Sequence, residues 1–389
     1  MRLYRTWIKG ILKLTTVNNS KGPFRADQVG SLLRPDELKA ARNQRQAGEI
    51  TAQTLRELED RLIADVVRKQ EEIGLEAVTD GDFRRGSWSG DFLNSISGVE
   101  MAVPQRGDRT TVPIGGVMRD WQPPAPQTRA RLIWPEDGIQ RSNYEFLARH
   151  VTRTAKVCIP SPSMLHFRGG RGAVDEAAYP EMAEFFDDAA DVWRKEIADL
   201  AAHGCRYVQL DDTNLAYLCD PRMRERAEAM GENLATLPST YADLINRSID
   251  SRPDDMTVTV HLCRGNSVSR GMAEGGYEPV AEVLFNEIKI DGFFLEYDSE
   301  RAGDFQPLRF VPPGVRVVLG VITSKFGELE SKNDIKRRID EAAEYVALDQ
   351  ICLSAQCGFA SHITGNVLSE EQQWAKLRLI VELADEIWG

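Results

Sequence analysis

The chain alternates between short apolar runs rich in β-branched residues and longer segments whose apolar residues recur every three or four positions. The first pattern is typical of buried strands and the second of amphipathic helices. Long helices are predicted over about 52–73, 176–203, 334–346 and 370–388. The clearest strand is Thr257-Val258-Thr259-Val260. In all, eight strands are predicted, which end near Ser31, Asp82, Ser163, Asp211, Cys263, Glu296, Thr323 and Cys357.

Eight strands with helices between most of them predict a single (β/α)8 TIM barrel. An open, doubly wound α/β sheet is the alternative, but no glycine-rich phosphate-binding motif follows the first strand. Residues 98–138 interrupt the alternation with six prolines and contain no helical pattern. We interpret this segment as a hairpin or flap inserted after the second strand. The predicted domains are a disordered N-terminal extension, 1–23, and a catalytic barrel, 24–389.

Composition narrows the class of protein. With 42% hydrophobic and 28% charged residues, the 389-residue chain resembles an ordinary globular protein. Its net charge of -12 argues against a nucleic-acid partner. No stretch approaches the roughly 20 apolar residues that cross a bilayer, so no membrane partner is predicted. The six cysteines form no paired framework, which predicts reduced thiols and a cytoplasmic location. The sequence does not fix the oligomeric state.

Potential metal ligands gather at the ends of three predicted strands. His261 and Cys263 lie two positions apart, so alternation sends both side chains to the same face. Glu296 and Cys357 each follow a further apolar run. One imidazole, two thiols and a carboxylate are ligands that suit zinc. Each residue alone has a structural explanation, since buried cysteines are often small hydrophobes. Together, the four strand ends favour a zinc site.

A zinc ion held by thiolates is a poor source of hydroxide, but it lowers the pKa of an additional thiol. The site therefore predicts activation of a substrate sulfur as a nucleophile. Ser31, Asp82 and Asp211 stand at other strand ends and suit an amino acid, with a hydroxyl for its carboxylate and acids for its ammonium. Structural roles are equally open: Ser31 could cap a helix, and Asp82 could pair with Arg84 or Arg85.

Seven short motifs carry a resemblance to a known family. They are Val29-Gly30-Ser31, Thr79-Asp80-Gly81-Asp82, Gln209-Leu210-Asp211-Asp212, His261-Leu262-Cys263, Phe294-Leu295-Glu296, Gly320-Val321 and Gln356-Cys357-Gly358-Phe359-Ala360-Ser361. In this order they resemble the catalytic barrel of cobalamin-independent methionine synthase, particularly its short single-barrel relatives. The resemblance covers nearly everything from Phe24 onward.

The resemblance implies a TIM barrel whose zinc is held by His261, Cys263, Glu296 and Cys357. It implies that the metal binds homocysteine as a thiolate, which takes a methyl group from N5 of a methyltetrahydrofolate to give methionine. Ser31 matches the serine that binds the carboxylate of homocysteine. Asp82 and Asp211 match the two acids that hold its amino group. Zinc is thus the expected cofactor, and His261, Cys263, Cys357 and Asp211 are the expected catalytic residues.

The chain departs from this family in three ways, which concern the methyl donor and the thiol acceptor. The chain has no room for the second barrel of the full-length synthase, and Asp82 stands where the family has glutamate. Thr323-Ser324-Lys325 replaces an Asp-x-His motif whose histidine helps protonate the departing pterin. Lys325 and His166 are the candidate replacements for this acid. The methyl donor is therefore left open between a folate, a corrinoid and a small methylated compound.

The prediction is a zinc-dependent S-methyltransferase that acts on homocysteine or a similar thiol. Within the same superfamily, the alternative is an alkyltransferase that joins another thiol to an electrophile, as in epoxyalkane:coenzyme M transferases. A metal-free barrel that resembles uroporphyrinogen decarboxylase is a third possibility, although it has no need of His261, Cys263 and Cys357 together. A zinc-binding protein without activity is the fourth, and its four ligands would close the metal site.

Overall fold

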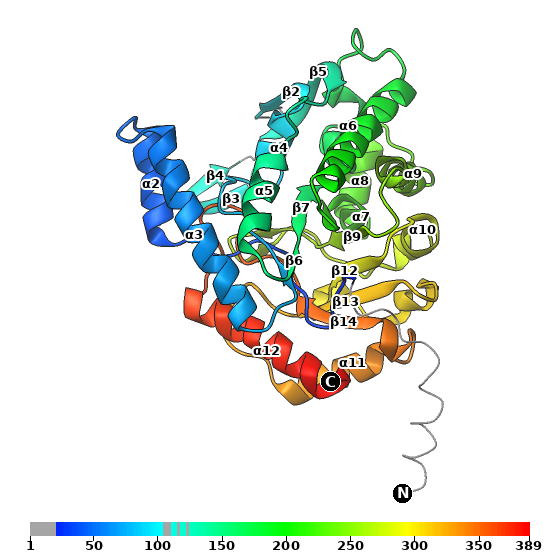
Figure 1. Ribbon diagram of the computed structural model, residues 1–389. Helices are drawn as coiled ribbons and strands as arrows, with labels where there is room; N and C mark the ends of the chain where they lie inside the picture. Colours follow the sequence, from blue (N-terminus) through cyan, green and yellow to red (C-terminus); the bar gives the residue numbers. More distant parts are fainter. Residues whose placement is uncertain (1–20, 104–109, 115–116, 122–123) are drawn as a thin grey trace, which may run out of the picture.

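Six parallel strands form the central sheet of the protein. The computed structural model describes residues 21–103, 110–114, 117–121 and 124–389 (Figure 1). The sheet has the order β14-β13-β12-β9-β8-β7. Its strands are β7 (Val157–Pro160), β8 (Tyr207–Asp212), β9 (Thr257–Leu262), β12 (Gly292–Glu296), β13 (Arg316–Ile322) and β14 (Ile351–Ala355). Because all six are parallel, their carboxyl ends lie at the same edge of the sheet.

Backbone pairing continues past both sides of this sheet. Beside β14, Ala26 forms a parallel bridge with Leu353, supported by a 2.8 Å hydrogen bond from Leu353 N to Arg25 O. On the other side, β6 (Thr154–Ala155) precedes β7 and pairs in parallel with β1 (Ala77–Val78). Between the segment around Ala26 and strand β1, the side-chain amide of Gln28 donates from Nε2 to Ala77 O at 2.9 Å.

The first two predicted strands are therefore much shorter than expected. The first is reduced to one bridge, and the second ends at Val78 rather than near Asp82. Glycine and a charged turn explain the difference, because Gly30, Gly81 and Asp82 all adopt positive φ angles that a strand cannot contain.

Helices surround the strands (Figure 1). They are α2 (Asp36–Gln46), α3 (Ala52–Glu72), α4 (Gly90–Asn94), α5 (Arg141–His150), α6 (Met182–Ala202), α7 (Asn214–Tyr217), α8 (Pro221–Ala229), α9 (Leu237–Ile249), α10 (Ala281–Glu287), α11 (Lys332–Ala342) and α12 (Glu370–Trp388). Short 3₁₀ turns occur at Pro162–Leu165, Gly170–Ala173, Glu278–Val280, Glu300–Ala302, Gln306–Phe310 and Leu348–Gln350. Within the described part of the chain, no helix combines the length and apolar character that crossing a membrane requires.

The four long helices predicted from the sequence are present as α3, α6, α11 and α12. The predicted ranges of α3 and α12 agree with the structure to within one residue. Helix α6 begins at Met182 rather than near 176. Pro180 gives a physical reason, because the residue before a proline is disfavoured in helical geometry.

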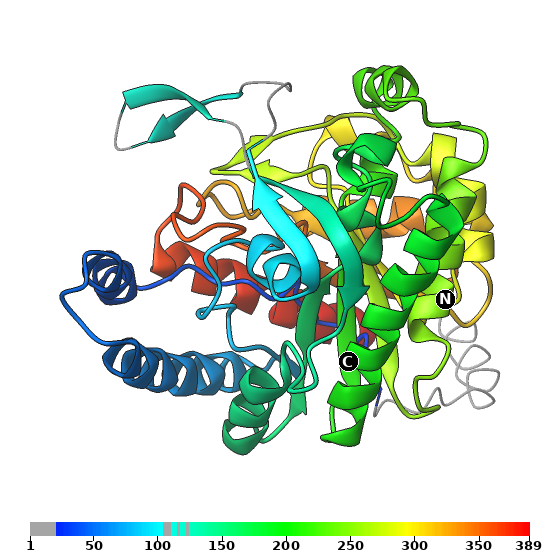
Figure 2. The ribbon, with the colours of Figure 1, turned by 90° about the horizontal axis from the view of Figure 1, so that it is seen from above.

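Two antiparallel strand pairs occupy the segment after the second predicted strand. β2 (Ser97–Ala102) pairs with β5 (Ala125–Ile133), and β3 (Thr110–Ile114) pairs with β4 (Val117–Trp121). Figure 2 shows the β3–β4 pair at a corner of the molecule, away from the helices. The predicted flap also includes residues 104–109, 115–116 and 122–123, which lie outside the described residues.

Helix α12 begins with a reciprocal cap. The hydroxyl of Ser369 accepts from Gln372 N at 3.2 Å, and the side chain of Gln372 accepts from Ser369 N at 2.8 Å. Ser369→Ala leaves an amide at the helix start without its partner, so we expect it to lower the free energy of unfolding by about 1 kcal/mol. Urea unfolding measures the change. The exposed loop residue Ser251 provides the control, since Ser251→Ala should change stability by less than about 0.5 kcal/mol. Equal losses in both variants would contradict the capping role.

Candidate functional site

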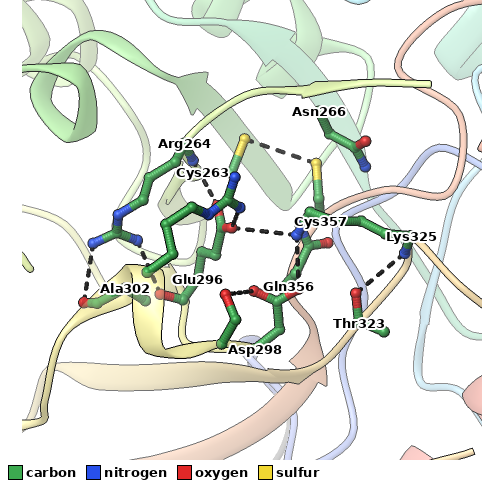
Figure 3. Close-up of polar contacts among 12 residues, drawn as sticks. Cys263, Arg264, Asn266, Glu296, Asp298, Ala302, Thr323, Lys325, Gln356 and Cys357 are labelled. Atoms are coloured by element: carbon green, nitrogen blue, oxygen red, sulfur yellow. Dashed lines mark hydrogen bonds and ion pairs between the residues drawn. The ribbon is translucent and has the colours of Figure 1, made fainter. Parts of the chain in front are cut away.

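Three of the four expected metal ligands meet at the carboxyl ends of β9 and β14. One ligand atom each from His261, Cys263 and Cys357 lies within 4.8 Å of the other two. The two sulfur atoms are 3.7 Å apart, and Figure 3 marks the contact between them. All three residues are buried. The imidazole and two thiols fit zinc, which binds these groups in a compact tetrahedral arrangement.

A carboxylate on the neighbouring strand β8 orients the histidine. Asp211 Oδ1 lies 3.1 Å from His261 Nδ1, and Gln209 Nε2 donates to the same oxygen at 2.8 Å. With Nδ1–H donating to Asp211, His261 Nε2 is the nitrogen available to a metal. Burial alone would lower the pKa of His261, but Cys263 and Asp211 raise it to about 10. Asp211 therefore acts on the histidine as well as lining the cavity described below.

Glu296, the fourth expected ligand, lies outside this group of atoms. Figure 3 shows its carboxylate among cations and amides. It accepts from Arg264 N at 2.6 Å and from Lys325 Nζ at 3.3 Å, and it pairs with Arg301. Burial favours the neutral acid, yet Lys325 and then Arg301 lower the pKa of Glu296, so the group is ionised. Its assignment as a zinc ligand stays a prediction.

This arrangement of Glu296 leads to an expected result. Because its charge is already balanced by Lys325 and Arg301, Glu296→Gln should retain one zinc per chain. It should also lower the free energy of unfolding, since Arg301 loses its charged partner and Lys325 keeps only Asp298. Elemental analysis and urea unfolding of the same preparation check the two parts. Loss of zinc from a variant that remains folded would show that Glu296 is a required ligand.

Neither candidate proton donor lines the main cavity. Lys325 Nζ is held by Asp298 at 2.6 Å and by Glu296. His166 Nδ1 lies 2.9 Å from the hydroxyl of Tyr241, beside a separate, smaller cavity. Burial lowers the pKa of His166 to about 4. Of the four expected ligands, Lys325 therefore contacts Glu296, and neither Lys325 nor His166 lines the cavity that His261, Cys263 and Cys357 share.

A cavity of about 700 Å³ opens beside the sulfur atoms. Ser31, Asp211, His261, Cys263 and Cys357 contribute to its walls, so five expected site residues share one space. Asp82 does not line it. Instead, Asp82 Oδ2 pairs with Arg85 Nη2 at 2.7 Å, which is the structural alternative that the sequence left open.

The position of Asp82 follows from its turn. Its φ angle of 58° is unusual for a residue other than glycine and turns the side chain out of the strand direction. Burial raises the pKa of Asp82 to about 7, against the opposing effect of Arg85. Asp82 lines a smaller neighbouring cavity, and Arg85 contributes to both.

Close packing holds Ser31 beside the loop that carries Cys357. Phe359 N donates to Ser31 O at 2.8 Å, and Ala360 N lies 3.4 Å from Ser31 Oγ. A Cβ at Gly358 would lie only 1.9 Å from that hydroxyl oxygen. Glycine therefore allows the loop to bring Cys357 and Ser31 to the same cavity.

Four further cavity residues were not predicted from the sequence. Arg85, Arg168, Tyr217 and His362 all contribute to the walls. Each belongs to a loop or short helix that follows a strand, the usual source of functional side chains in sheets of this kind. Their place in such loops was a usable signal, but it does not distinguish them from the many other polar residues there.

Comparisons with known proteins place the chain in a family. No family model matches it. The uncharacterized protein YxjH of Bacillus subtilis is 46% identical over 381 residues, covering 96% of this chain and 97% of the relative. The methionine synthase of Pyrococcus furiosus is 23% identical over 332 residues, covering 85% and 84%. A crystal structure of the putative vitamin-B12 independent methionine synthase from Listeria monocytogenes matches with a TM-score of 0.76 and 39% identity. Since that match covers 95% of this chain and all of the other, the protein belongs to the family of B12-independent methionine synthases.

Proposed function

We propose that the protein is a zinc-dependent S-methyltransferase that methylates the sulfur of homocysteine to give methionine. The observation that carries this proposal is the grouping of His261, Cys263 and Cys357 in the wall of a cavity large enough for substrates. The metal-free, decarboxylase-like alternative gives no reason for two thiols and an imidazole to converge. Membership of a methionine synthase family supports the choice of acceptor.

We also infer that the sheet closes into a (β/α)8 barrel formed by residues 24–389. The parallel bridge at Ala26, the β1–β6 pair and the Gln28 contact across the gap support closure. Residues 98–138 are then an insertion after the second strand, and residues 1–23 are an extension. Such a barrel places the metal ligands on the face where this architecture carries its chemistry.

The residues of this site suit thiol chemistry. Zinc, when bound by His261, Cys263 and Cys357, supplies a lowered pKa for the thiol of the acceptor. Asp211 fixes the orientation of His261 and presents a negative charge to the ammonium of the acceptor. Ser31 offers a hydroxyl for its carboxylate. Because all three ligands are buried, water has limited access to the sulfur of an acceptor bound beside them.

Among the described residues of the cavity wall, we identify no ready proton donor for the leaving group of the methyl donor. A methyl group on N5 of a folate leaves well only if the departing amine is protonated. Lys325 and His166 do not line the cavity, and burial, with Arg168, Arg85 and Arg34, lowers the pKa of His362 to about 4. We therefore propose faster transfer from methylcobalamin, whose leaving group needs no proton, than from methyltetrahydrofolate.

A substrate screen tests this function. Zinc-loaded protein is incubated with homocysteine and one donor at a time, namely methyltetrahydrofolate, methylcobalamin or a small methylated compound, and methionine is followed by mass spectrometry. Methionine from at least one donor, dependent on zinc, is the expected result. Absence of product with every donor would overturn the proposal.

One observation favours a second candidate. Arg85 and Arg168 line the cavity, and cations suit an acid-bearing thiol such as 2-mercaptoethanesulfonate. An alkyltransferase that joins this thiol to an epoxide is therefore included in the screen as a separate reaction. A thioether product from that pair, without methionine from homocysteine, would support this alternative.

A further inference from the structure

Arg168 stands out among the cations of the main cavity. It follows β7 in the loop that contains the Pro162–Leu165 turn, is partly buried and lines the cavity wall. Within the described part of the chain, no hydrogen bond or ion pair joins its guanidinium to another residue, and the groups that act on its charge are Tyr217 and Arg226. Burial lowers the pKa of Arg168, with Arg226 acting in the same direction.

Three other arginines that are at least partly buried each have a hydrogen-bond partner, although Nε of Arg34 and Nε of Arg42 have none. Arg42 pairs with Glu59 at 2.9 Å, and Arg141 pairs with Asp199 at 2.5 Å. Arg34, close to the same cavity, donates to three backbone carbonyls. Arg168 has no such partner in the described structure, although removing a cation from water without one costs free energy. An unbalanced charge in a cavity wall is typical of a site that awaits a ligand.

Further basic side chains lie near Arg168. Arg85 and His362 line the same cavity, and the charges of Arg168, Arg85 and Arg34 all act on His362. Arg34 itself has a pKa lowered to about 9 by burial and then by Arg85. Asp91, Asp211 and Asp212 also line the cavity, and Arg85 is paired with Asp82, so among the described residues of this wall Arg168 is the arginine without a paired carboxylate. An anion bound beside Arg168 would supply that counter-charge.

Tyr217 connects Arg168 to the group of metal ligands. It lines the cavity, and both Arg168 and Cys263 act on its ionisation. Burial raises the pKa of Tyr217 to about 12, so its hydroxyl remains a neutral donor. A Cβ at Gly265 would lie 2.4 Å from that oxygen, which shows how closely the segment after Cys263 packs on it. A ligand in the 700 Å³ cavity can thus contact the sulfur atoms and Arg168 together.

We propose that Arg168, with Arg85 and His362 beside it, forms a subsite for an oxyanion of the carboxylate class on one of the substrates. The planar guanidinium offers two parallel donors to such a group, which a lysine does not. The assignment rests on the proposed methyl transfer for the identity of the substrates. Two sources share this chemistry: the α-carboxylate of the thiol acceptor and the acidic tail of the methyl donor.

Direct anion binding tests the subsite without requiring turnover. Inorganic phosphate is titrated calorimetrically into zinc-loaded wild-type protein, Arg168→Met, Arg168→Lys and the control Arg194→Met, which removes an exposed arginine on α6. We expect Arg168→Met to weaken phosphate binding about 10- to 100-fold, the usual loss for a charge-assisted hydrogen bond. The phosphate affinity of Arg168→Lys should lie between those of wild type and Arg168→Met. The phosphate affinity of Arg194→Met should equal that of wild type. Thermal unfolding shows that each variant is folded.

Substrate fragments distinguish the two sources. Homocysteine is compared with 3-aminopropane-1-thiol, which lacks the carboxylate, and methyltetrahydrofolate is compared with the methylated pterin that lacks the glutamyl tail. If the acceptor occupies the subsite, Arg168→Met weakens the binding of homocysteine about 10- to 100-fold and leaves the affinity for the aminothiol unchanged. If the donor occupies it, the same pattern appears in the folate pair.

The outcomes separate this inference from the proposed function. Phosphate binding that is equal in folded wild-type and Arg168→Met protein, or absent from both, overturns the subsite, even if methionine is produced. Phosphate binding that depends on Arg168 supports it, even if no donor gives methionine. In that second case the proposed reaction fails while the anion site stands.

Discussion

Cys263→Ser is expected to abolish stoichiometric zinc binding. Cys263 supplies one of only two sulfur atoms in the group of three ligands, and its Sγ lies 3.7 Å from that of Cys357. Serine is a far weaker zinc ligand than thiolate at neutral pH. Zinc affinity should therefore fall by more than the roughly 10- to 100-fold that accompanies loss of a supporting residue. Elemental analysis and competition with a chelator measure the change, and methyl transfer should be lost with it.

A second buried cysteine provides the matched control. Cys205 is fully buried but lies outside the ligand group, and its thiol faces Tyr207 O at 3.5 Å. Cys205→Ser should keep one zinc per chain, with at most a modest loss of stability. Equal zinc content in Cys263→Ser and Cys205→Ser would show that the metal, if bound, is held elsewhere.

Asp211→Asn is expected to weaken two interactions at once. The substitution removes the charge that fixes His261 Nδ1, so zinc affinity should fall about 10- to 100-fold. It also removes a charge-assisted hydrogen bond to the ammonium of the acceptor, which should cost on the order of 1.5–3 kcal/mol in affinity. At saturating zinc the protein should remain loaded, so calorimetry with homocysteine isolates the second effect.

Asp91→Asn is the control for that experiment. Asp91 also lines the cavity, but its carboxylate accepts from the backbone amides of Gly86 and Ser87 and touches no expected metal ligand. Zinc affinity should be unchanged in this variant. Unaltered homocysteine affinity in zinc-loaded Asp211→Asn would reject the amino-acid pocket and favour a different thiol.

The sequence predicted the strands of the central sheet and the meeting of His261, Cys263 and Cys357 better than the surroundings of these residues. The apolar runs placed β9, β12 and β14 correctly, because buried parallel strands require such runs. Alternation along β9 then placed His261 and Cys263 on one side, and a parallel sheet necessarily brought the end of β14 to the same edge.

What the sequence could not give depends on contacts between distant loops. Glu296 ends its strand as predicted, but its carboxylate is drawn to Lys325 and Arg301, which come from other segments. The positive φ angle of Asp82 reflects a turn that no apolar pattern records. Arg168 and His362 reach the cavity through irregular backbone, where neither period 2 nor period 3.6 indicates the direction of a side chain.

X-ray absorption at the zinc K edge tests the central claim most directly. Zinc-loaded protein should show two sulfur ligands at about 2.3 Å together with nitrogen from one imidazole. Adding homocysteine should raise the sulfur count from two to three, because the substrate thiol joins Cys263 and Cys357. A sulfur count that stays at two in the presence of saturating homocysteine, or zinc surrounded by oxygen and nitrogen alone, would contradict the account.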